Sequence, residues 1–265
     1  MPTERFVIFT AGYNCADAAV SCLNSVRRQS YRDYRHIVVD DASTDDTWAS
    51  IERRGHPHLV AHRNAANRKW LANALEHLHP RDDDIVVLLD LDDWLAGRHV
   101  LQTVADTYRR ERCWLTYGDY SAASSLPRSP LLRRLRALLR IPDKPARHCR
   151  PLPPEILTER AFRQYPFCTS HLITFRGFLW NALRADDLVG WDGQYPAMAW
   201  DTAIMFPMLE MCRPGTIRYL PQVLCVYNDL NPLNDKKLDR TLQQKTEAWF
   251  RAKPKYPVLQ RDSTA

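Results

Sequence analysis

The residues best suited to chemistry form a short acidic stretch near the middle of the chain. Residues 85–89 are continuously apolar, and Asp90, Asp92 and Asp93 follow them. A continuous apolar run between polar residues is typical of a strand buried on both faces of a parallel sheet. Ligands of open α/β sheets bind beyond the carboxyl ends of such strands. If the strand continues through Asp92, the side chains of Asp90 and Asp92 project to the same side.

Two carboxylates at one strand end repel each other, and their burial is costly. A divalent cation relieves this conflict, and hard oxygen ligands suit Mg²⁺ or Mn²⁺, which bridge carboxylates to the phosphates of a substrate. The alternative is a polar loop whose acids cap the next helix, which would begin near residues 97–99. The acidic stretch alone leaves metal binding and capping both open.

The bulk composition is that of a soluble globular protein with one large α/β domain, or with one domain and an appended segment. The chain has 265 residues, 45% of them hydrophobic, and a net charge of +6 that favours anionic substrates or an anionic membrane surface. Its seven cysteines include no C-x-x-C pair, which argues against zinc and disulfide frameworks and favours a reducing compartment.

No apolar stretch approaches the roughly 20 residues that a membrane span needs. Met1 is followed almost directly by a predicted strand, so we expect no signal peptide. These features favour a cytoplasmic location. Nucleic acid is the least expected partner, because the basic residues near the middle of the chain are not interleaved with aromatic residues.

Alternating apolar segments predict a doubly wound, Rossmann-like and mostly parallel sheet flanked by helices. Asp17 is a candidate N-cap for the first helix. The expected strands cover residues 6–9, 34–41, 58–61, 85–89, 114–117, 169–175 and 216–227, with a turn at 118–119. The expected helices cover residues 17–28, 48–53, 69–78, 100–110, 177–184 and 198–211. We expect a first part at 1–120, an insertion at 121–150, a second part of the same domain at 151–240, and a helix and tail at 241–265.

The insertion contains a leucine- and arginine-rich segment at residues 131–140, bracketed by prolines. On a helical wheel its leucines share one face and its arginines lie outside it, which predicts a basic amphipathic helix. Such a helix either lies on an anionic membrane surface, making the protein peripheral on the cytoplasmic membrane face, or packs on the domain with a solvated arginine face. The leucines on the shared face are Leu131, Leu132, Leu135, Leu138 and Leu139. The arginines outside it are Arg133, Arg134, Arg136 and Arg140.

Four motifs in order make the chain resemble the family 2 glycosyltransferases, which have the GT-A fold and transfer sugars with inversion of the anomeric centre. The resemblance covers roughly residues 5–240. One departure is that many members have Arg-Asn late in the helix before the acidic motif, whereas here Ala72 precedes Asn73, and Lys69 or Arg68 is the candidate replacement. The motifs are Thr10-Ala-Gly-Tyr-Asn14, Val38-Val-Asp-Asp-Ala-Ser-Thr-Asp45, Asp90-Leu-Asp-Asp-Trp94 and Trp200-Asp201.

The resemblance implies a transfer from a nucleotide-diphosphate sugar, most simply UDP-linked, to a saccharide or lipid-linked saccharide in cell-surface polysaccharide, lipopolysaccharide or glycan assembly. It implies Asp201 as the general base and Mn²⁺ or Mg²⁺ at Asp92 and Asp90. Trp191 and Trp200 are candidate acceptor contacts because aromatic faces pack on sugar rings, and His171 is a candidate contact to the acceptor or the metal. The implied donor-binding residues are Thr10, Ala11, Tyr13, Asn14, Asp40, Asp41, Lys69, Asn73, Asp90, Leu91 and Asp92.

Structural alternatives exist for most of these residues. Asp40, Asp41 and Ser43 could simply start a helix, Asp201 could cap the helix that follows it, and the tryptophans could belong to the core. A nucleotidyltransferase that makes sugar nucleotides is a second functional hypothesis, although the turn after the first strand lacks the basic phosphate loop typical of that class. A non-catalytic nucleotide-sugar or glycan-binding module is a third, although such a module needs no base.

Overall fold

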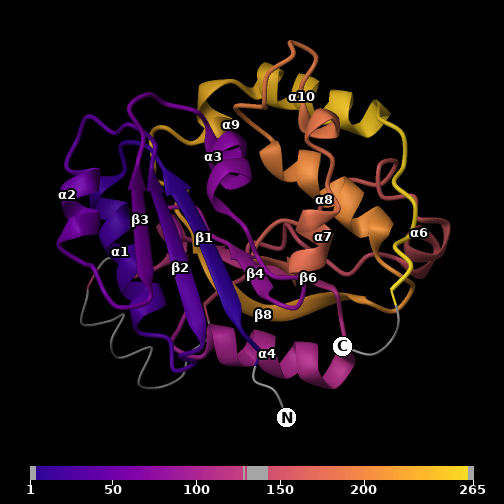
Figure 1. The fold of residues 1–265 in the computed structure, drawn as a ribbon, viewed down its shortest axis with the longest axis horizontal. Coiled ribbons are helices and arrows are strands. Elements are labelled where there is room, and N and C mark those ends of the chain that lie inside the picture. Colours follow the sequence, from indigo (N-terminus) through magenta and orange to yellow (C-terminus); the bar gives the residue numbers. More distant parts are fainter. Residues whose placement is uncertain (1–3, 128, 130–142, 262–265) are drawn as a thin grey trace.

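The computed structural model describes residues 4–127, 129 and 143–261, and the side chains of residues 235 and 236 are outside the description. Within these ranges the chain forms one eight-stranded sheet with helices on both faces (Figure 1). The segment at 131–140, for which we predicted an amphipathic helix, lies outside the described residues. No described helix is both long and apolar enough to cross a bilayer.

The elements follow the alternation that the sequence predicted. The strands are β1 (Phe6–Gly12), β2 (Tyr34–Asp40), β3 (Leu59–Arg63), β4 (Ile85–Leu88), β5 (Trp94–Leu95), β6 (Leu115–Ala122), β7 (Ile173–Arg176) and β8 (Ile217–Tyr227). The α-helices are α1 (Ala16–Arg27), α2 (Thr47–Glu52), α3 (Trp70–His77), α4 (Val100–Glu111), α6 (Pro154–Glu159), α7 (Gly177–Asn181), α8 (Trp200–Met211), α9 (Asp235–Leu238) and α10 (Arg240–Ala252). Two 3-10 helices are η1 (Ala123–Ser125) and η2 (Ala185–Leu188).

The sheet is parallel in one half and mixed in the other. Its strand order is β3-β2-β1-β4-β7-β6-β8-β5, and β3, β2, β1 and β4 are mutually parallel. Beyond β4 the next pairing, with β7, is antiparallel, and β6 pairs antiparallel with β7 and parallel with β8. The mostly parallel α/β sheet expected from the sequence is therefore confirmed. Strands from before residue 120 and after residue 150 belong to one sheet.

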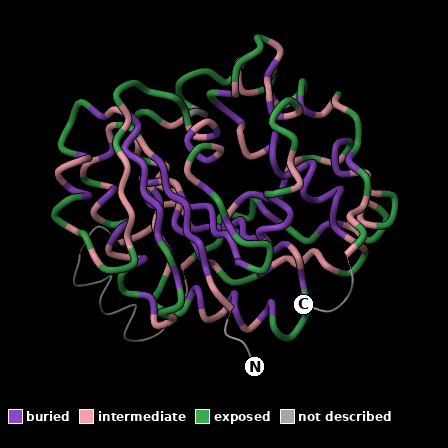
Figure 2. The backbone as a smooth tube through the Cα atoms, in the orientation of Figure 1, coloured by how far each residue is buried: buried purple, intermediate pink, exposed green. Residues whose placement is uncertain are grey.

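Both faces of the sheet are buried, as the continuous apolar runs predicted. Successive residues of a strand alternate between two core clusters, because side chains point to opposite faces. Phe6 and Ile8 join the cluster under α1 and α4, whereas Val7 and Phe9 join the cluster under α3, α8 and α10. Figure 2 shows the resulting buried strands at the centre of the molecule.

Three local expectations were wrong. Regular strand β4 ends at Leu88, and the N–H of Asp93 donates to the carbonyl of Asp90, so residues 90–93 form a turn. The positions of Asp90 and Asp92 are therefore set by this turn and not by strand alternation. Helix α1 has Cys15 at its N-cap, and Asp17 lies in its first turn. The predicted turn at 118–119 is an irregularity inside β6, where Gly118 gives room for the carbonyl of Leu220.

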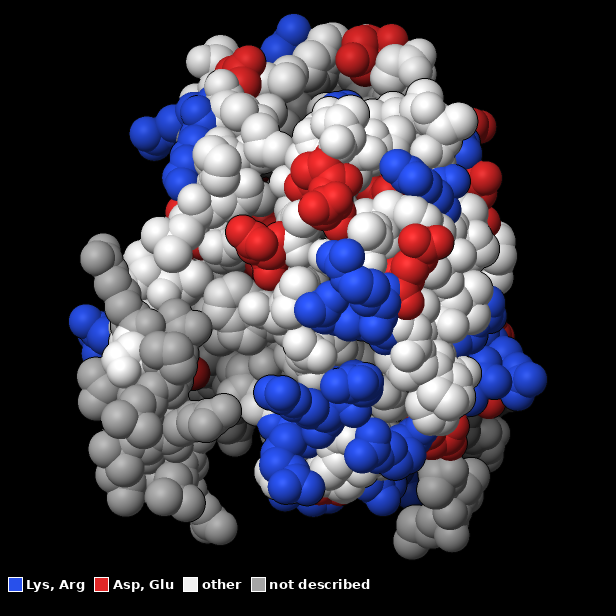
Figure 3. Space-filling model, turned by 90° about the vertical axis from the view of Figure 1, so that its left-hand side faces the viewer, with Lys and Arg blue, Asp and Glu red and all other residues white. Residues whose placement is uncertain are grey.

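Basic side chains gather on one face of the molecule, around the ends of α1 and α2 (Figure 3). Arg27 and Arg28 lie at the end of α1 and Arg53 at the end of α2, where cations stabilise the helix dipole. Arg35 lies near the start of β2 and is also exposed. The cluster therefore lies at the end of the parallel strands opposite to their carboxyl ends, away from the acidic turn.

His36 is a buried polar residue in the parallel half of the sheet. Its Nε2 lies 2.9 Å from the hydroxyl of Thr10 on β1, and its side chain is fully buried. Burial, with the nearby His56, lowers the pKa of His36 from 6.5 to about 3. The folded protein therefore holds His36 in its neutral form at any pH near neutrality.

This burial predicts a loss of stability in acid. Between pH 6.5 and 3 the unfolded chain binds the proton that folded His36 excludes, so its contribution to stability is complete above pH 6.5 and falls as the pH falls. The free energy of unfolding should drop by about 2–3 kcal/mol more between pH 7 and 4.5 in wild type than in His36→Gln. Urea unfolding at the two pH values measures this difference. His79→Gln, which alters an exposed histidine, should keep the wild-type drop; an unchanged drop in His36→Gln would contradict the assignment.

Candidate active site

A cavity of about 590 Å³ opens at the carboxyl ends of β1 and β4. It is walled by α3 and the start of α8, by the segment before β7, by the segment after β8, and by α10. Ten of the residues predicted from the sequence lie around it. They are Ala11, Tyr13, Asp41, Lys69, Asn73, Asp90, Asp92, His171, Trp200 and Asp201.

The acidic turn at residues 90–93 is held by the end of β8. Asn231 donates from Nδ2 to Oδ2 of Asp92 at 2.6 Å, and the N–H of Asn228 donates to Oδ1 of Asp93 at 2.8 Å. Nε2 of His171 lies 3.6 Å from Oδ2 of Asp93, so this histidine joins the acids. Burial raises the pKa of Asp92, and burial together with the charges of Asp92 and Asp90 raises that of Asp93 well above its usual value.

The acids fit a cation that is shared with a ligand. Among the described residues, no group of three or more His, Cys, Asp and Glu side chains is arranged to hold a metal ion. Mg²⁺ and similar ions commonly take only one or two protein carboxylates and complete their shell with substrate phosphates and water. Burial raises the pKa of Asp92, so a cation would stabilise its charged form, and Asp90 lines the same cavity. Asp92 and Asp90 therefore suit a metal brought together with a phosphate-bearing ligand.

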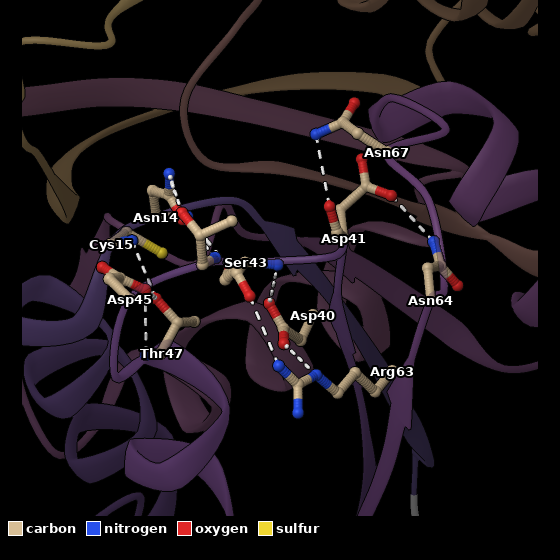
Figure 4. A network of polar contacts seen from close by, with 11 residues as sticks. Asn14, Cys15, Asp40, Asp41, Ser43, Asp45, Thr47, Arg63, Asn64 and Asn67 are labelled. Atoms are coloured by element: carbon tan, nitrogen blue, oxygen red, sulfur yellow. Dashed lines mark hydrogen bonds and ion pairs between the residues drawn. The ribbon is translucent and has the colours of Figure 1, made fainter.

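Asp41 organises the loop that leads into α3. Its Oδ1 accepts the N–H of Arg68 at 2.8 Å and Nδ2 of Asn64 at 2.7 Å, and its Oδ2 accepts the N–H of Lys69 at 2.9 Å. Figure 4 shows Asn64 and Asn67 directed at this residue. Asp41 thus fixes the backbone that carries Lys69 to the cavity. Arg68, the other candidate for the missing family arginine, forms an ion pair with Glu76.

Asp40 lies behind the cavity. It is fully buried, accepts the N–H of Ser43 at 3.2 Å, and lies 3.2 Å from Nε of Arg63 (Figure 4). The N-cap of α2 is Asp46, and no side chain caps it, so the proposed capping by Asp40, Asp41 or Ser43 is not observed. Four further predicted residues also lie outside the cavity lining, and they are Thr10, Asn14, Leu91 and Trp191.

These outlying residues have identifiable structural contacts. Thr10 contacts His36, Asn14 accepts the N–H of Thr44 at 2.8 Å, and Leu91 is buried in the core. The ring of Trp191 packs against the ammonium of Lys245 at 4.2 Å. Four of the five therefore support the walls of the site from behind, and Trp191 lies away from it.

Asp201 lies in the first turn of α8. The N-cap of this helix is Ala199, in a left-handed conformation with φ 53°, so Asp201 is not the cap. Its Oδ1 accepts the N–H of Thr202 at 3.0 Å. A carboxylate in a first helical turn is favoured by the helix dipole. The first turn of α8 and the N–H of Thr202 thus fix the carboxyl group of Asp201 beside the cavity.

Two tryptophans stack across the site. The rings of Trp70 on α3 and Trp200 on α8 lie 3.5 Å apart and are tilted by 8°. Sequence reasoning missed Trp70, because a tryptophan near the start of an amphipathic helix resembles an ordinary core residue. The contact of Asn231 with Asp92 depends on the return of β8 to the acidic turn. No local motif marks either residue.

Replacing Asp41 should loosen the loop before α3. In Asp41→Asn one oxygen remains, and the amide NH₂ faces a backbone N–H that has lost its acceptor, which costs about 1–3 kcal/mol. Trypsin should cleave after Arg68 and Lys69 faster than in wild type, as read by mass spectrometry of timed digests. Asp46→Asn alters an exposed acid of the preceding segment and should leave the rate unchanged. Equal cleavage in both variants would show that Asp41 does not hold the loop.

Comparisons with known proteins agree with this architecture. The family model described as "Glycosyl transferase family 2" matches residues 7–167. WfaP of Escherichia coli, named as a UDP-Glc:alpha-D-GlcNAc-diphosphoundecaprenol beta-1,3-glucosyltransferase, is 35% identical over 123 residues, covering 44% of this chain and 46% of WfaP. The match thus spans less than half of that relative.

Solved structures share the fold. TarS of S. aureus superposes with a TM-score of 0.58 at 16% identity, covering 85% of this chain and 37% of TarS. The mannosyltransferase PcManGT of Pyrobaculum calidifontis, in complex with GDP-Man and Mn²⁺, gives 0.55 at 20% identity, covering 86% of this chain and 57% of that chain. At these identities the likeness shows the fold alone, which is the GT-A fold predicted from the sequence. Because the family model spans more than half of the residues, the chain belongs to glycosyl transferase family 2.

Proposed function

We propose that this chain transfers a sugar from a UDP-linked donor to the hydroxyl of a lipid-linked saccharide, with inversion at the anomeric carbon. The observation that carries the proposal is one cavity lined by both the acidic turn at 90–93 and Asp201. The turn suits a diphosphate and its cation, and Asp201 suits a proton acceptor. A binding module does not need the proton acceptor Asp201. A nucleotidyltransferase does not need a base that faces an acceptor hydroxyl.

The donor occupies the half of the cavity between the parallel strands and α3. Nδ2 of Asn73 and Nε1 of Trp70 are buried donors without a hydrogen-bond partner among the described residues, and both residues line the cavity. Buried donors of this kind are costly unless a ligand accepts from them. Ala11, Tyr13 and Asp41 contribute the nucleoside side, and Lys69 the phosphate side. Thr10, Asn14, Asp40 and Leu91 act by holding these walls.

Related proteins support the choice of donor. WfaP is named for UDP-Glc, and TarS has been solved with UDP-GlcNAc and with UDP. We propose a Mn²⁺ or Mg²⁺ ion at Asp92 and Asp90, in line with the Mn²⁺ bound in PcManGT. The cation would neutralise the charge that develops on the leaving diphosphate.

Asp201 takes the proton of the attacking hydroxyl. The acceptor oxygen forms its bond to the anomeric carbon while the bond from that carbon to the diphosphate breaks, and the proton passes to the carboxylate. This single displacement inverts the centre and releases UDP. Trp200, braced by Trp70, offers an aromatic face to an acceptor sugar, and His171 contacts the acidic turn, on the side of the leaving group.

The acceptor class follows from the same relative. WfaP acts on a diphosphoundecaprenol-linked GlcNAc, so we propose a lipid-linked saccharide in cell-surface polysaccharide or lipopolysaccharide assembly. The enzyme would work at the cytoplasmic face of the membrane. Docking through residues 131–140 remains part of the proposal, as does the division into parts at residues 120, 150 and 240.

The donor site can be tested by a screen of UDP- and GDP-linked sugars with and without Mn²⁺. A UDP sugar with Mn²⁺ should raise the melting temperature of the wild-type protein and be slowly hydrolysed. Asp92→Asn should lose the metal-dependent part of this stabilisation and keep its fold by circular dichroism. Asp17→Asn, which changes an exposed acid on α1, is the matched control. Metal-dependent stabilisation that survives in Asp92→Asn would refute the metal assignment.

Asp201→Asn should separate binding from chemistry. Asparagine is nearly isosteric and still accepts the N–H of Thr202, so the fold and the donor-dependent stabilisation should be retained. Turnover with UDP-glucose and a short-chain alkyl diphosphate of GlcNAc should fall by about 10² or more, because the proton acceptor is missing. Near-normal turnover would place the base elsewhere. Loss of donor binding instead would place Asp201 on the donor side.

A further inference from the structure

Several polar side chains of the segment that follows β8, residues 228–239, form hydrogen bonds within the protein. Asn231 donates to Asp92, and Asn234 donates to the hydroxyl of Tyr227. Lys237 donates from Nζ to the carbonyls of Asp229 at 2.7 Å and Asn231 at 3.1 Å. These three side chains, of Asn231, Asn234 and Lys237, therefore bind the acidic turn, the end of β8 and the segment itself.

The leucines of the same segment are exposed. Leu230, Leu233 and Leu238 are 64%, 39% and 55% exposed. The other large apolar side chains that are exposed among the described residues are Tyr13 and Trp249. Tyr13, Leu233 and Leu238 line the cavity, so the exposed apolar groups gather at its mouth.

Single exposed leucines need no explanation on a soluble protein. Three exposed leucines within nine residues do need an explanation, because the segment carries enough Asn, Asp and Lys to present a polar surface. An arrangement in which Asn231, Asn234 and Lys237 bond to the protein while the leucines are exposed is unusual for a surface loop. It suits a segment whose outer side meets hydrocarbon. Exposed Arg240, two residues after Leu238, suits phospholipid headgroups.

We propose that Leu230, Leu233 and Leu238 insert into the hydrocarbon edge of a membrane, so that the cavity opens directly onto the layer that contains the acceptor. This proposal rests on the lipid-linked acceptor proposed above and adds the surface by which the enzyme reaches it. The surface differs from residues 131–140, and it joins the mouth of the cavity. The membrane would close the mouth on its open side and keep the acceptor's sugar within reach of Asp201.

Vesicle co-sedimentation of the whole chain tests the proposal. The probes are phosphatidylcholine vesicles with and without phosphatidylglycerol, each at low and high salt. The test protein is Leu230→Ser/Leu233→Ser/Leu238→Ser, checked for folding by urea unfolding. Pro232→Ser, an exposed residue of the same segment, is the matched control. A further variant measures the contribution of residues 131–140 to vesicle binding. It has glutamine in place of Arg133, Arg134, Arg136 and Arg140.

At high salt, where attraction between charges is screened, the triple variant should partition at least about tenfold less than wild type. Pro232→Ser and the arginine variant should partition like wild type under that condition. Leu230 does not line the cavity. The single substitution Leu230→Ser should therefore lower partitioning about threefold and leave the stabilisation by UDP and Mn²⁺ unchanged.

Three results would overturn the proposal. The first is equal partitioning of wild type and the triple variant, and the second is no binding of wild type to any vesicle. The third is a wild-type dimer, measured by light scattering, that the triple variant loses, because the leucines would then face a second copy. Failure of the proposed function can be distinguished from failure of the membrane proposal. If the proposed function is wrong, UDP with Mn²⁺ will not stabilise the protein and no sugar will be transferred, regardless of the result with vesicles.

Discussion

The site depends on keeping three carboxylates together at the end of one buried strand. Asp90, Asp92 and Asp93 follow a strand that carries only apolar side chains into the core, so the turn is fixed by the packing beneath it. Their mutual repulsion is offset from the opposite side by the end of β8, where Asn228 and Asn231 donate to Asp93 and Asp92. The arrangement leaves the turn ready for a cation and its phosphate ligand.

The antiparallel strand β7 explains why residues from late in the chain reach this turn. If the neighbour of β4 ran parallel to it, the residues that enter that strand would lie at the opposite edge of the sheet from the site. Because β7 runs in the opposite direction, the residues that enter it lie beside the residues that leave β4. His171 thereby approaches Asp93 at 3.6 Å, although the two are far apart in sequence. The chain brings its second half to the acidic turn by a reversal of strand direction.

Sequence reasoning predicted the elements well where a periodic apolar pattern was continuous. It correctly predicted the alternating parallel half and the two-sided burial of β4, because local patterns specify these features. Asp201, chosen by resemblance to the family, lines the cavity, and its role as a base stays a prediction. Asp40 and Trp191, for which ligand contacts were predicted, do not line the cavity. The direction in which a side chain such as that of Asp40 points after a strand depends on loop hydrogen bonds, which the sequence does not show. Sequence reasoning missed the stack of Trp70 on Trp200, which depends on the packing of α3 against α8.

The position of β4 in the middle of the mixed sheet bears on how the chain acquires its structure. β1 covers one edge of β4 and β7, which begins at Ile173, covers the other. While the chain is being synthesised, everything up to the acidic turn emerges before β7 exists, so β4 has a bare hydrophobic edge. Such an edge is a template for pairing with other chains. The part of the chain up to the acidic turn thus keeps an unpaired strand edge until β7 is added, and a nascent chain of this protein is open to aggregation until the reversal at β7 is complete.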